Sequence, residues 1–170
     1  MTLSACAPER PRHWTVHCDG SAMPNPGRMG VGAVITQPDG TRHTLSQATH
    51  AIGCNNEAEL RALTLALKEL RARGASAVVA YSDNSILVEQ LGAAGARPIA
   101  RLAPLFDDAR ALLGEFEEAR VQWIPRHRNS EADALARAAL GAGPKPPPKP
   151  WKKRRQLRRW EGPPSWLAGW

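Results

Sequence analysis

Short apolar runs rich in β-branched residues recur along the chain, separated by turn residues or by longer stretches with helical spacing. Runs of this kind, bounded by Pro, Asp, Asn and Gly, predict strands that end in turns. The run at 77–82 is continuously apolar, which is typical of a strand covered by helices on its faces. We expect five strands, over residues 15–18, 29–37, 42–49, 77–82 and 121–126.

Four further stretches have the spacing of amphipathic helices. In the first, four leucines recur three or four residues apart, so one side of the helix is apolar. We expect Asn55 or Asn56 to cap this helix and Gly74 to end it after Arg73. The other helices are expected over 84–91, 99–118 and 131–140, the last of them capped by Asn129 or Ser130.

The order of these elements predicts the fold class. Three strands precede the first helix, and strands and helices alternate after it. An antiparallel start followed by alternation is typical of an α/β protein in which helices cover one mixed sheet.

Charge divides the chain into unequal parts. Residues 1–140 hold 15 Lys and Arg against 15 Asp and Glu, whereas residues 141–170 hold 8 Lys and Arg against one Glu. The whole net charge of +7 therefore lies in the last thirty residues. We expect a disordered leader over 1–12, a folded domain over 13–141 and a basic, Pro- and Trp-rich extension over 142–170.

The cysteines and the apolar runs indicate in which cell compartment the protein is expected. Cys6, Cys18 and Cys54 are odd in number and lack Cys-x-x-Cys spacing, which argues against a disulfide framework and against a zinc site. No run has the length of a secretory leader or a membrane span. We expect a cytoplasmic monomer without a membrane partner.

Four acidic residues stand where strands end or helices begin. Asp19 and Asp83 follow predicted strands, and Glu59 and Asp133 fall in the first turns of predicted helices. Each has a simpler explanation, because Asp-Gly is a common turn and acids suit helix N-termini. If all four converge at one edge of the sheet, their repulsion calls for cations. Mg²⁺ or Mn²⁺ prefers oxygen ligands, and a pair of such ions is the usual arrangement for displacement at phosphorus.

Four segments, CDGSAMPNPG, NNEAEL, YSDNS and WIPRHRNSEADALARAA, resemble the type 1 branch of the ribonuclease H family in content and in order. The resemblance spans residues 14–140. It implies a ribonuclease H-like fold with a five-stranded mixed sheet, three antiparallel strands followed by parallel ones, flanked by helices. It also implies hydrolysis of the RNA strand of an RNA–DNA hybrid with two Mg²⁺ or Mn²⁺ ions.

The resemblance assigns roles position by position. Asp19 would bridge both ions, Asp83 would bind the ion that activates water, and Asp133 would complete the set. Glu59, and not Glu57, matches the family's metal-binding glutamate. His127 lies where the family often has a mobile histidine that assists proton transfer or product release, although a loop histidine is more often a solvated side chain.

The same resemblance implies contacts with the hybrid. Its 2′-hydroxyl groups distinguish RNA from DNA, and the expected contacts come from Gly20, Ser21, Asn25, Asn55, Asn56 and Ser85. Asn25 also suits a turn. This chain departs from the family at Cys54, where Thr or Ser is usual, and at Glu57, where a basic residue is frequent. These two residues would bind a DNA phosphate less tightly than the family's usual residues. The segment 92–102 also lacks the basic, Trp-containing protrusion of some members.

The basic extension offers a replacement for that protrusion. Cations interleaved with aromatic rings suit phosphate contact and base stacking, and the expected contacts are Trp151, Lys152, Lys153, Arg154, Arg155, Arg158, Arg159 and Trp160. Alternatively, the extension is a solvated tail without contacts, or it binds single-stranded nucleic acid or a protein partner. For the domain, the alternatives are activity on double-stranded RNA as well, or a nucleic-acid-binding module without catalysis.

Overall fold

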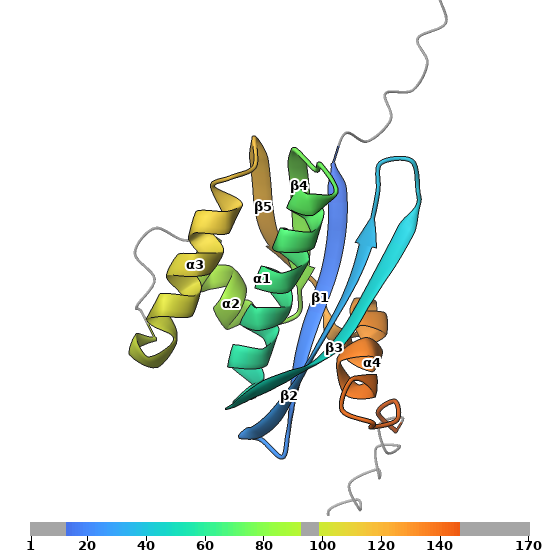
Figure 1. Ribbon diagram of the computed structural model, residues 1–170, viewed down its shortest axis with the longest axis vertical. Coiled ribbons are helices and arrows are strands. Elements are labelled where there is room, and N and C mark those ends of the chain that lie inside the picture. The colour runs from blue at the N-terminus through green and yellow to red at the C-terminus, as the bar shows by residue number, and fades with distance from the viewer. Residues whose placement is uncertain (1–12, 93–98, 147–170) are drawn as a thin grey trace, which may run out of the picture.

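A computed structural model describes residues 13–92 and 99–146, which form one five-stranded sheet with helices on both faces (Figure 1). The order across the sheet is β3-β2-β1-β4-β5. The strands are β1 (Trp14–Met23), β2 (Gly27–Thr36), β3 (Arg42–Gly53), β4 (Ala77–Ser82) and β5 (Glu118–Trp123).

Strand directions confirm the predicted mixed sheet. β1 is antiparallel to β2, and β2 is antiparallel to β3. On the other side of β1, β4 is parallel to β1 and β5 is parallel to β4. The central strand is therefore β1, which has an antiparallel neighbour on one side and a parallel neighbour on the other.

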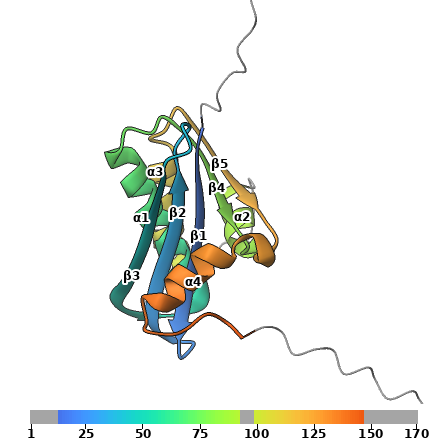
Figure 2. The ribbon, with the colours of Figure 1, turned by 90° about the vertical axis from the view of Figure 1, so that its right-hand side faces the viewer.

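The helices divide unequally between the two faces. Three of them cover one face and α4 covers the other, as the two perpendicular views show (Figures 1 and 2). They are α1 (Asn55–Ala72), α2 (Ser85–Gly92), α3 (Ala103–Leu113) and α4 (Ser130–Ala138), with short 3₁₀ turns η1 (Ala100–Leu102) and η2 (Arg126–Arg128).

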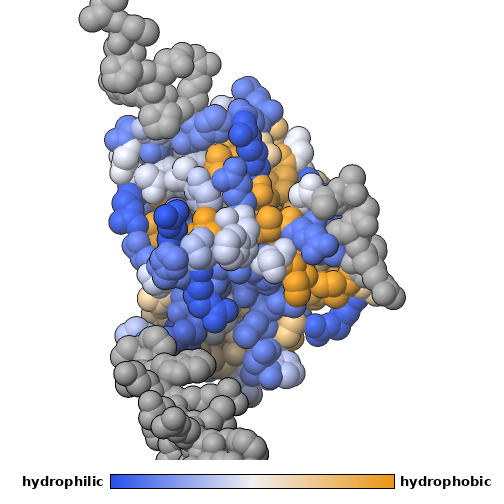
Figure 3. Space-filling view, turned by 180° about the vertical axis from the view of Figure 1, so that it is seen from behind, coloured by the Kyte–Doolittle hydropathy of each residue, from blue (hydrophilic) through white to orange (hydrophobic). Residues whose placement is uncertain are grey.

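The main core lies between α1 and the sheet. Leu60, Leu63, Leu67 and Leu70 are fully buried there, as their helical spacing predicts. Seen from behind, the surface is mostly polar, with apolar side chains in small groups (Figure 3). Among the described residues, no helix combines the length and apolarity that crossing a membrane requires.

Three strand predictions had wrong bounds, and the simplest case is β3, which continues past residue 49 to Gly53. The other two are β1 and β5. β1 does not end before Asp19, because its pairing with β2 continues to Met23 opposite Arg28. The polar, turn-like residues after Asp19 are thus part of the strand. β5 begins at Glu118, three residues before its apolar run, since it pairs with β4 while its side chains lie at the sheet edge.

The predicted helix starts also need correction. α1 begins at Asn55, after Cys54, whose side chain makes no capping hydrogen bond, so neither Asn55 nor Asn56 is the cap. The Asn129 side chain likewise makes no capping bond to α4. Glu59 is the fifth residue of α1 and so lies beyond its first turn. The helix expected over 99–118 is a 3₁₀ turn followed by α3, which ends before Gly114.

Glycines allow two helix backbones to approach the sheet closely. A Cβ at Gly20 of β1 would lie 2.1 Å from the carbonyl carbon of Ala58 and 2.2 Å from the amide nitrogen of Glu59. On the opposite face, a Cβ at Gly32 of β2 would lie 2.4 Å from the carbonyl oxygen of Ala132 in α4. These contacts set the positions of α1 and α4 against the sheet.

Replacing Gly20 with alanine should therefore destabilise the domain. Overpacking a close backbone contact typically costs about 1–3 kcal/mol, and backbone atoms of α1 cannot move without displacing the helix. Chemical denaturation of Gly20→Ala measures the loss. Gly92→Ala is the matched control, because a Cβ there meets nothing within 4 Å. Equal unfolding free energies for the two variants would contradict this account of the packing.

Candidate active site

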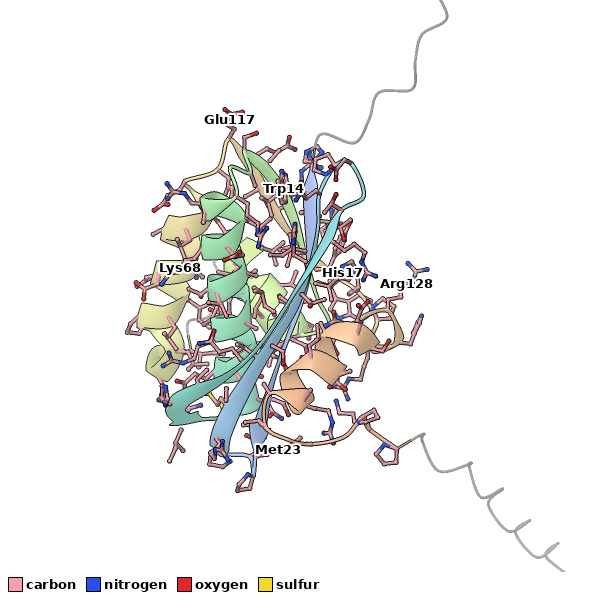
Figure 4. The ribbon with its side chains drawn as sticks, turned by 45° about the vertical axis from the view of Figure 1, so that its right-hand side comes forward. Trp14, His17, Met23, Lys68, Glu117 and Arg128 are labelled. Carbon is pink, nitrogen blue, oxygen red and sulfur yellow. The ribbon has the colours of Figure 1, made fainter. Side chains whose placement is uncertain are left out.

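A cavity of about 210 Å³ opens beside the C-terminal half of β1. Met23, which lines it, marks that end of the strand in Figure 4. All four predicted acids line the cavity, together with side chains from every element around it. The lining residues are Asp19, Gly20, Ser21, Ala22, Met23, Asn55, Glu59, Asp83, Arg126, Asp133, Arg137 and Lys145.

Asp19 lies where the two central strands part. The last parallel pair between β1 and β4 is His17 with Tyr81, so Asp19 has lost its neighbour on that side. It is 6% exposed, and its Oδ1 accepts the Gly20 backbone N–H at 2.9 Å. Burial, followed by the charges of Glu59 and of other nearby acids, raises the pKa of Asp19 to about 8.

Glu59 reaches the cavity from α1. Burial raises its pKa to about 7, against the effect of a hydrogen bond with the Asn84 side chain. Its Oε2 is buried without a hydrogen-bond partner. A buried oxygen of this kind carries a desolvation cost that a bound cation would offset.

Asp83 directly follows β4, as predicted, and is held from three sides. Asn129 Nδ2 donates to its Oδ1 at 2.9 Å, and Arg126 Nε donates to its Oδ2 at 3.1 Å. Trp123 Nε1 donates to its backbone oxygen at 3.2 Å. Asn129 Nδ2 also bonds the carbonyl oxygen of Cys18 at 3.0 Å, and so bridges the two strands where they separate.

Asp133 lies in the first turn of α4, as predicted, and pairs with Lys145. Lys145 comes from the segment that follows α4. Two of the four carboxylates, Asp83 and Asp133, thus already have a cationic side chain as a partner.

The chemistry of this donor set fits a hard divalent ion, because it consists of carboxylate oxygens and one of them is buried without a partner. As the side chains lie, however, no three His, Cys, Asp or Glu residues within 13–92 and 99–146 are grouped so as to hold a metal ion. Arg126 pairs with Asp83 and Lys145 pairs with Asp133. Asp19 is buried and Glu59 is half-buried, and both have raised pKa values.

The residues expected to contact substrate fall into two groups. Gly20, Ser21 and Asn55 line the cavity. The other three, Asn25, Asn56 and Ser85, are not among the lining residues. Several of these side chains hold the frame itself, since Asn55 Oδ1 accepts the Ala22 N–H at 2.8 Å and Asn25 Oδ1 accepts the Asn55 N–H at 3.2 Å.

Asn56, Ser85 and His127 lie outside the cavity lining. Asn56 Oδ1 accepts a hydrogen bond from Asn84 Nδ2 at 3.1 Å. Ser85 is exposed at the start of α2, and His127 is exposed on η2. Its neighbour Arg126, rather than His127, contacts a predicted acid.

Glu57 lies off the cavity, in agreement with the choice of Glu59. It pairs with Arg61 one turn along α1 at 2.9 Å, and its carboxylate packs against Gly53. The basic cluster between Trp151 and Trp160, and the leader over 1–12, fall outside the described residues.

Sequence reasoning missed five residues that shape the site, which are Asn84, Arg126, Asn129, Arg137 and Lys145. Asn84 could have been found from its place directly after an acid. Asn129 was noticed only as a helix cap. Nothing in the sequence separates Lys145 from the other cations of the extension.

Comparisons with known proteins agree on one family. A family model described as reverse transcriptase-like matches residues 17–139. Ribonuclease HI of Halobacterium salinarum is 32% identical over 133 residues, covering 78% of this chain and 67% of that protein. The Bifunctional protein Rv2228c of Mycobacterium tuberculosis is 34% identical over 129 residues. The match covers 75% of this chain but only 35% of that relative, so the chain spans about a third of its length.

Solved structures give the same result. The crystal structure of RNase H1 from Halobacterium salinarum matches with a TM-score of 0.71 and 30% identity, covering 76% of this chain and 98% of that one. LC11-RNase H1 in complex with an RNA/DNA hybrid matches with a TM-score of 0.67 and 29% identity, covering 75% and 96%.

The raised pKa of Asp19 predicts how the stability of the metal-free protein depends on pH. A carboxyl group with a higher pKa in the folded state binds its proton more tightly there than in the unfolded chain. Its contribution to stability is complete below about pH 4 and is lost as the pH rises through about 8. Asp19→Asn removes this dependence and keeps the acceptor for the Gly20 N–H.

In a chelator, Asp19→Asn should therefore melt several degrees above the wild type at about pH 9, with a smaller difference at about pH 5. Thermal melts followed by circular dichroism at both pH values measure this. A difference that does not grow with pH would show that Asp19 is not held in an unfavourable charged state.

Proposed function

The chain belongs to the ribonuclease H family, and on that premise we propose that it is an endoribonuclease that hydrolyses the RNA strand of RNA–DNA hybrids with two divalent metal ions. One observation carries the proposal. Four carboxylates from four separate segments line one cavity. Asp19 is buried and Glu59 is half-buried, and their pKa values are raised to about 8 and 7. Such an arrangement costs stability, so it favours a functional explanation over a structural one.

Asp19, Glu59, Asp83 and Asp133 would hold the ions. When bound, Mg²⁺ or Mn²⁺ would supply a water-derived nucleophile and stabilise charge on the phosphate oxygens. The chain itself supplies position and orientation. Asn129 and Arg126 orient Asp83 through hydrogen bonds to its two oxygens, and the buried backbone around Gly20 keeps Asp19 and Glu59 close to one another.

A hybrid as substrate is supported by the relative LC11-RNase H1, which was solved with an RNA/DNA hybrid. We propose that Gly20, Ser21, Asn25, Asn55, Asn56 and Ser85 contact it. Two hydrogen bonds support this by fixing the rim of the cavity to the start of α1: the Ala22 N–H donates to Asn55 Oδ1, and the Asn55 N–H donates to Asn25 Oδ1. We also propose that His127, which is exposed on η2, assists proton transfer or product release.

Arg101 adds a positive charge near Cys54, one of the positions where the sequence predicts weaker phosphate binding than in the family. Its guanidinium lies 3.0 Å from the Sγ of Cys54, the residue that precedes Asn55. Partial burial alone would raise the pKa of the Cys54 thiol. Backbone hydrogen bonds and the Arg101 side chain, however, lower it. Arg101 thus supplies a cation beside Cys54, at the start of α1.

The extension completes the proposal as a tether for the hybrid. The described chain ends at Pro146, immediately after Lys145, which lines the cavity. Single-stranded nucleic acid and a protein partner remain alternatives for this segment. A cytoplasmic location is part of the proposal and is supported by Cys18 and Cys54, both free thiols.

The Glu59→Gln variant should lose at least about 100-fold in kcat on a hybrid with a labelled RNA strand, in Mg²⁺ and in Mn²⁺. Even a supporting residue around a metal ligand typically costs 10–100-fold, and a ligand should cost more. Glu57→Gln is the matched control, since it changes the same charge in the same helix but off the cavity. It should retain wild-type activity.

Equal activity of the two glutamine variants would contradict the assignment of Glu59. A wild-type chain that binds the hybrid but leaves both strands intact would support the non-catalytic binding module instead.

The salt dependence of hybrid binding tests the cationic contacts. A phosphate contact contributes about 0.9 to the slope of log K against log salt concentration. Arg101→Gln should therefore raise KM with little change in kcat and flatten the slope by about one, whereas Lys68→Gln should leave KM and the slope unchanged.

A chain that ends at Pro146 lacks seven cations and keeps Lys145, and its slope should fall by up to about six. Slopes equal to that of the wild type would contradict the corresponding contact.

A further inference from the structure

The segment that follows α4 returns toward the cavity instead of leaving the domain. Gly141 adopts a φ of +74°, in the left-handed region that glycine favours, and its N–H donates to the Ala138 oxygen at 2.9 Å. Ala142 donates to the Arg137 oxygen at 3.0 Å, and Arg137 Nε donates to the Gly143 oxygen at 2.9 Å. Figure 2 shows the chain turning after α4 and running back beneath it.

This return places Lys145 on Asp133. The two side chains form an ion pair, in which the Asp133 side chain is 15% exposed and that of Lys145 is 48% exposed. Asp133 and Arg137 are four residues apart in α4, and both line the cavity. The arginine that holds the returning backbone is therefore on the same side of the helix as the acid that receives the lysine.

The ammonium group also acts on a second acid of the cluster. Burial is the main influence on the pKa of Glu59, and it raises that pKa. The charge of Lys145 is among the smaller influences that lower it. Lys145 thus acts as a cation near two carboxylates that the fold brings together. Without it, Asp133 would have no cationic partner in a cavity where Asp19 and Glu59 are already disfavoured as anions.

We propose that Lys145 is a built-in counter-ion that occupies the place of a cation at Asp133 until a divalent metal binds, and so sets the metal concentration that the site requires. This inference rests on the proposed metal site. Since nearly half of the Lys145 side chain is exposed, it can move into solvent when a metal arrives. The backbone bonds of Gly141 to Gly143 need not break, because none of them involves the lysine.

The proposal predicts two effects of opposite sign for Lys145→Gln in the full-length chain. In a chelator the variant should melt below the wild type at about pH 8, because Asp133 loses its partner. In titration calorimetry at fixed ionic strength, the variant should bind Mn²⁺ about two- to fivefold more tightly, because the metal no longer competes with an ion pair of the usual partly exposed strength.

Two further variants separate this role from others. Lys68→Gln removes the same charge from an exposed position of α1 on the far side of the sheet from α4 (Figure 4), and it should change neither quantity. In an Asp133→Asn background, Lys145→Gln should raise Mn²⁺ affinity by less than it does in the wild type, because the counter-ion has lost its main carboxylate partner. An equal gain in both backgrounds would contradict the role at Asp133.

Failure of the counter-ion role and failure of the metal site give different results in these measurements. Unchanged or weaker Mn²⁺ binding by Lys145→Gln, while the wild type binds Mn²⁺, would overturn the counter-ion role and leave the metal site standing. A similar gain in Lys68→Gln would reduce the effect to net charge and would also overturn it. If the wild type binds no Mn²⁺, the proposed metal site fails, and this inference fails with it.

Discussion

The site depends on the close approach of two helix backbones to the central strands. At Gly20 the backbone of α1 occupies the space that any other side chain would need, and at Gly32 the backbone of α4 does the same on the opposite face. Each helix carries one acid, Glu59 or Asp133, toward the point where β1 and β4 separate. Tight packing of backbone on backbone leaves little freedom to relax, so the carboxylates are brought together by the fold and not by attraction between them.

Electrostatic consequences follow from that packing. Burial raises the pKa values of Asp19 and Glu59, and the charges of neighbouring acids raise them further. The domain compensates with its own cations, Arg126 on Asp83 and Lys145 on Asp133. The domain can therefore hold an acidic cluster without metal. Because the side chain of Arg126 is largely exposed and that of Lys145 is nearly half exposed, a divalent cation can displace them from the carboxylates. The same arrangement explains why a hard divalent ion suits the site.

The order of elements and the four acids could be predicted from the sequence, because apolar periodicity and local motifs are local signals. What failed depended on pairing between distant segments. The stretch after Asp19 contains Gly, Ser and Pro and looks like a loop, yet β2 pairs with it as far as Met23. β5 begins among charged residues that lie at a sheet edge, so no apolar run marks its start. Lys145 reaches Asp133 only because the chain reverses at Gly141, and no spacing in the sequence reveals that contact.

The most direct test of the central claim is the anomalous scattering of Mn²⁺ in crystals of the full chain. We expect two peaks within ligand distance of the carboxylates of Asp19, Glu59, Asp83 and Asp133, with Lys145 turned away from Asp133. Peaks confined to other parts of the surface, or none at the carboxylates while Mn²⁺ is in excess, would contradict it.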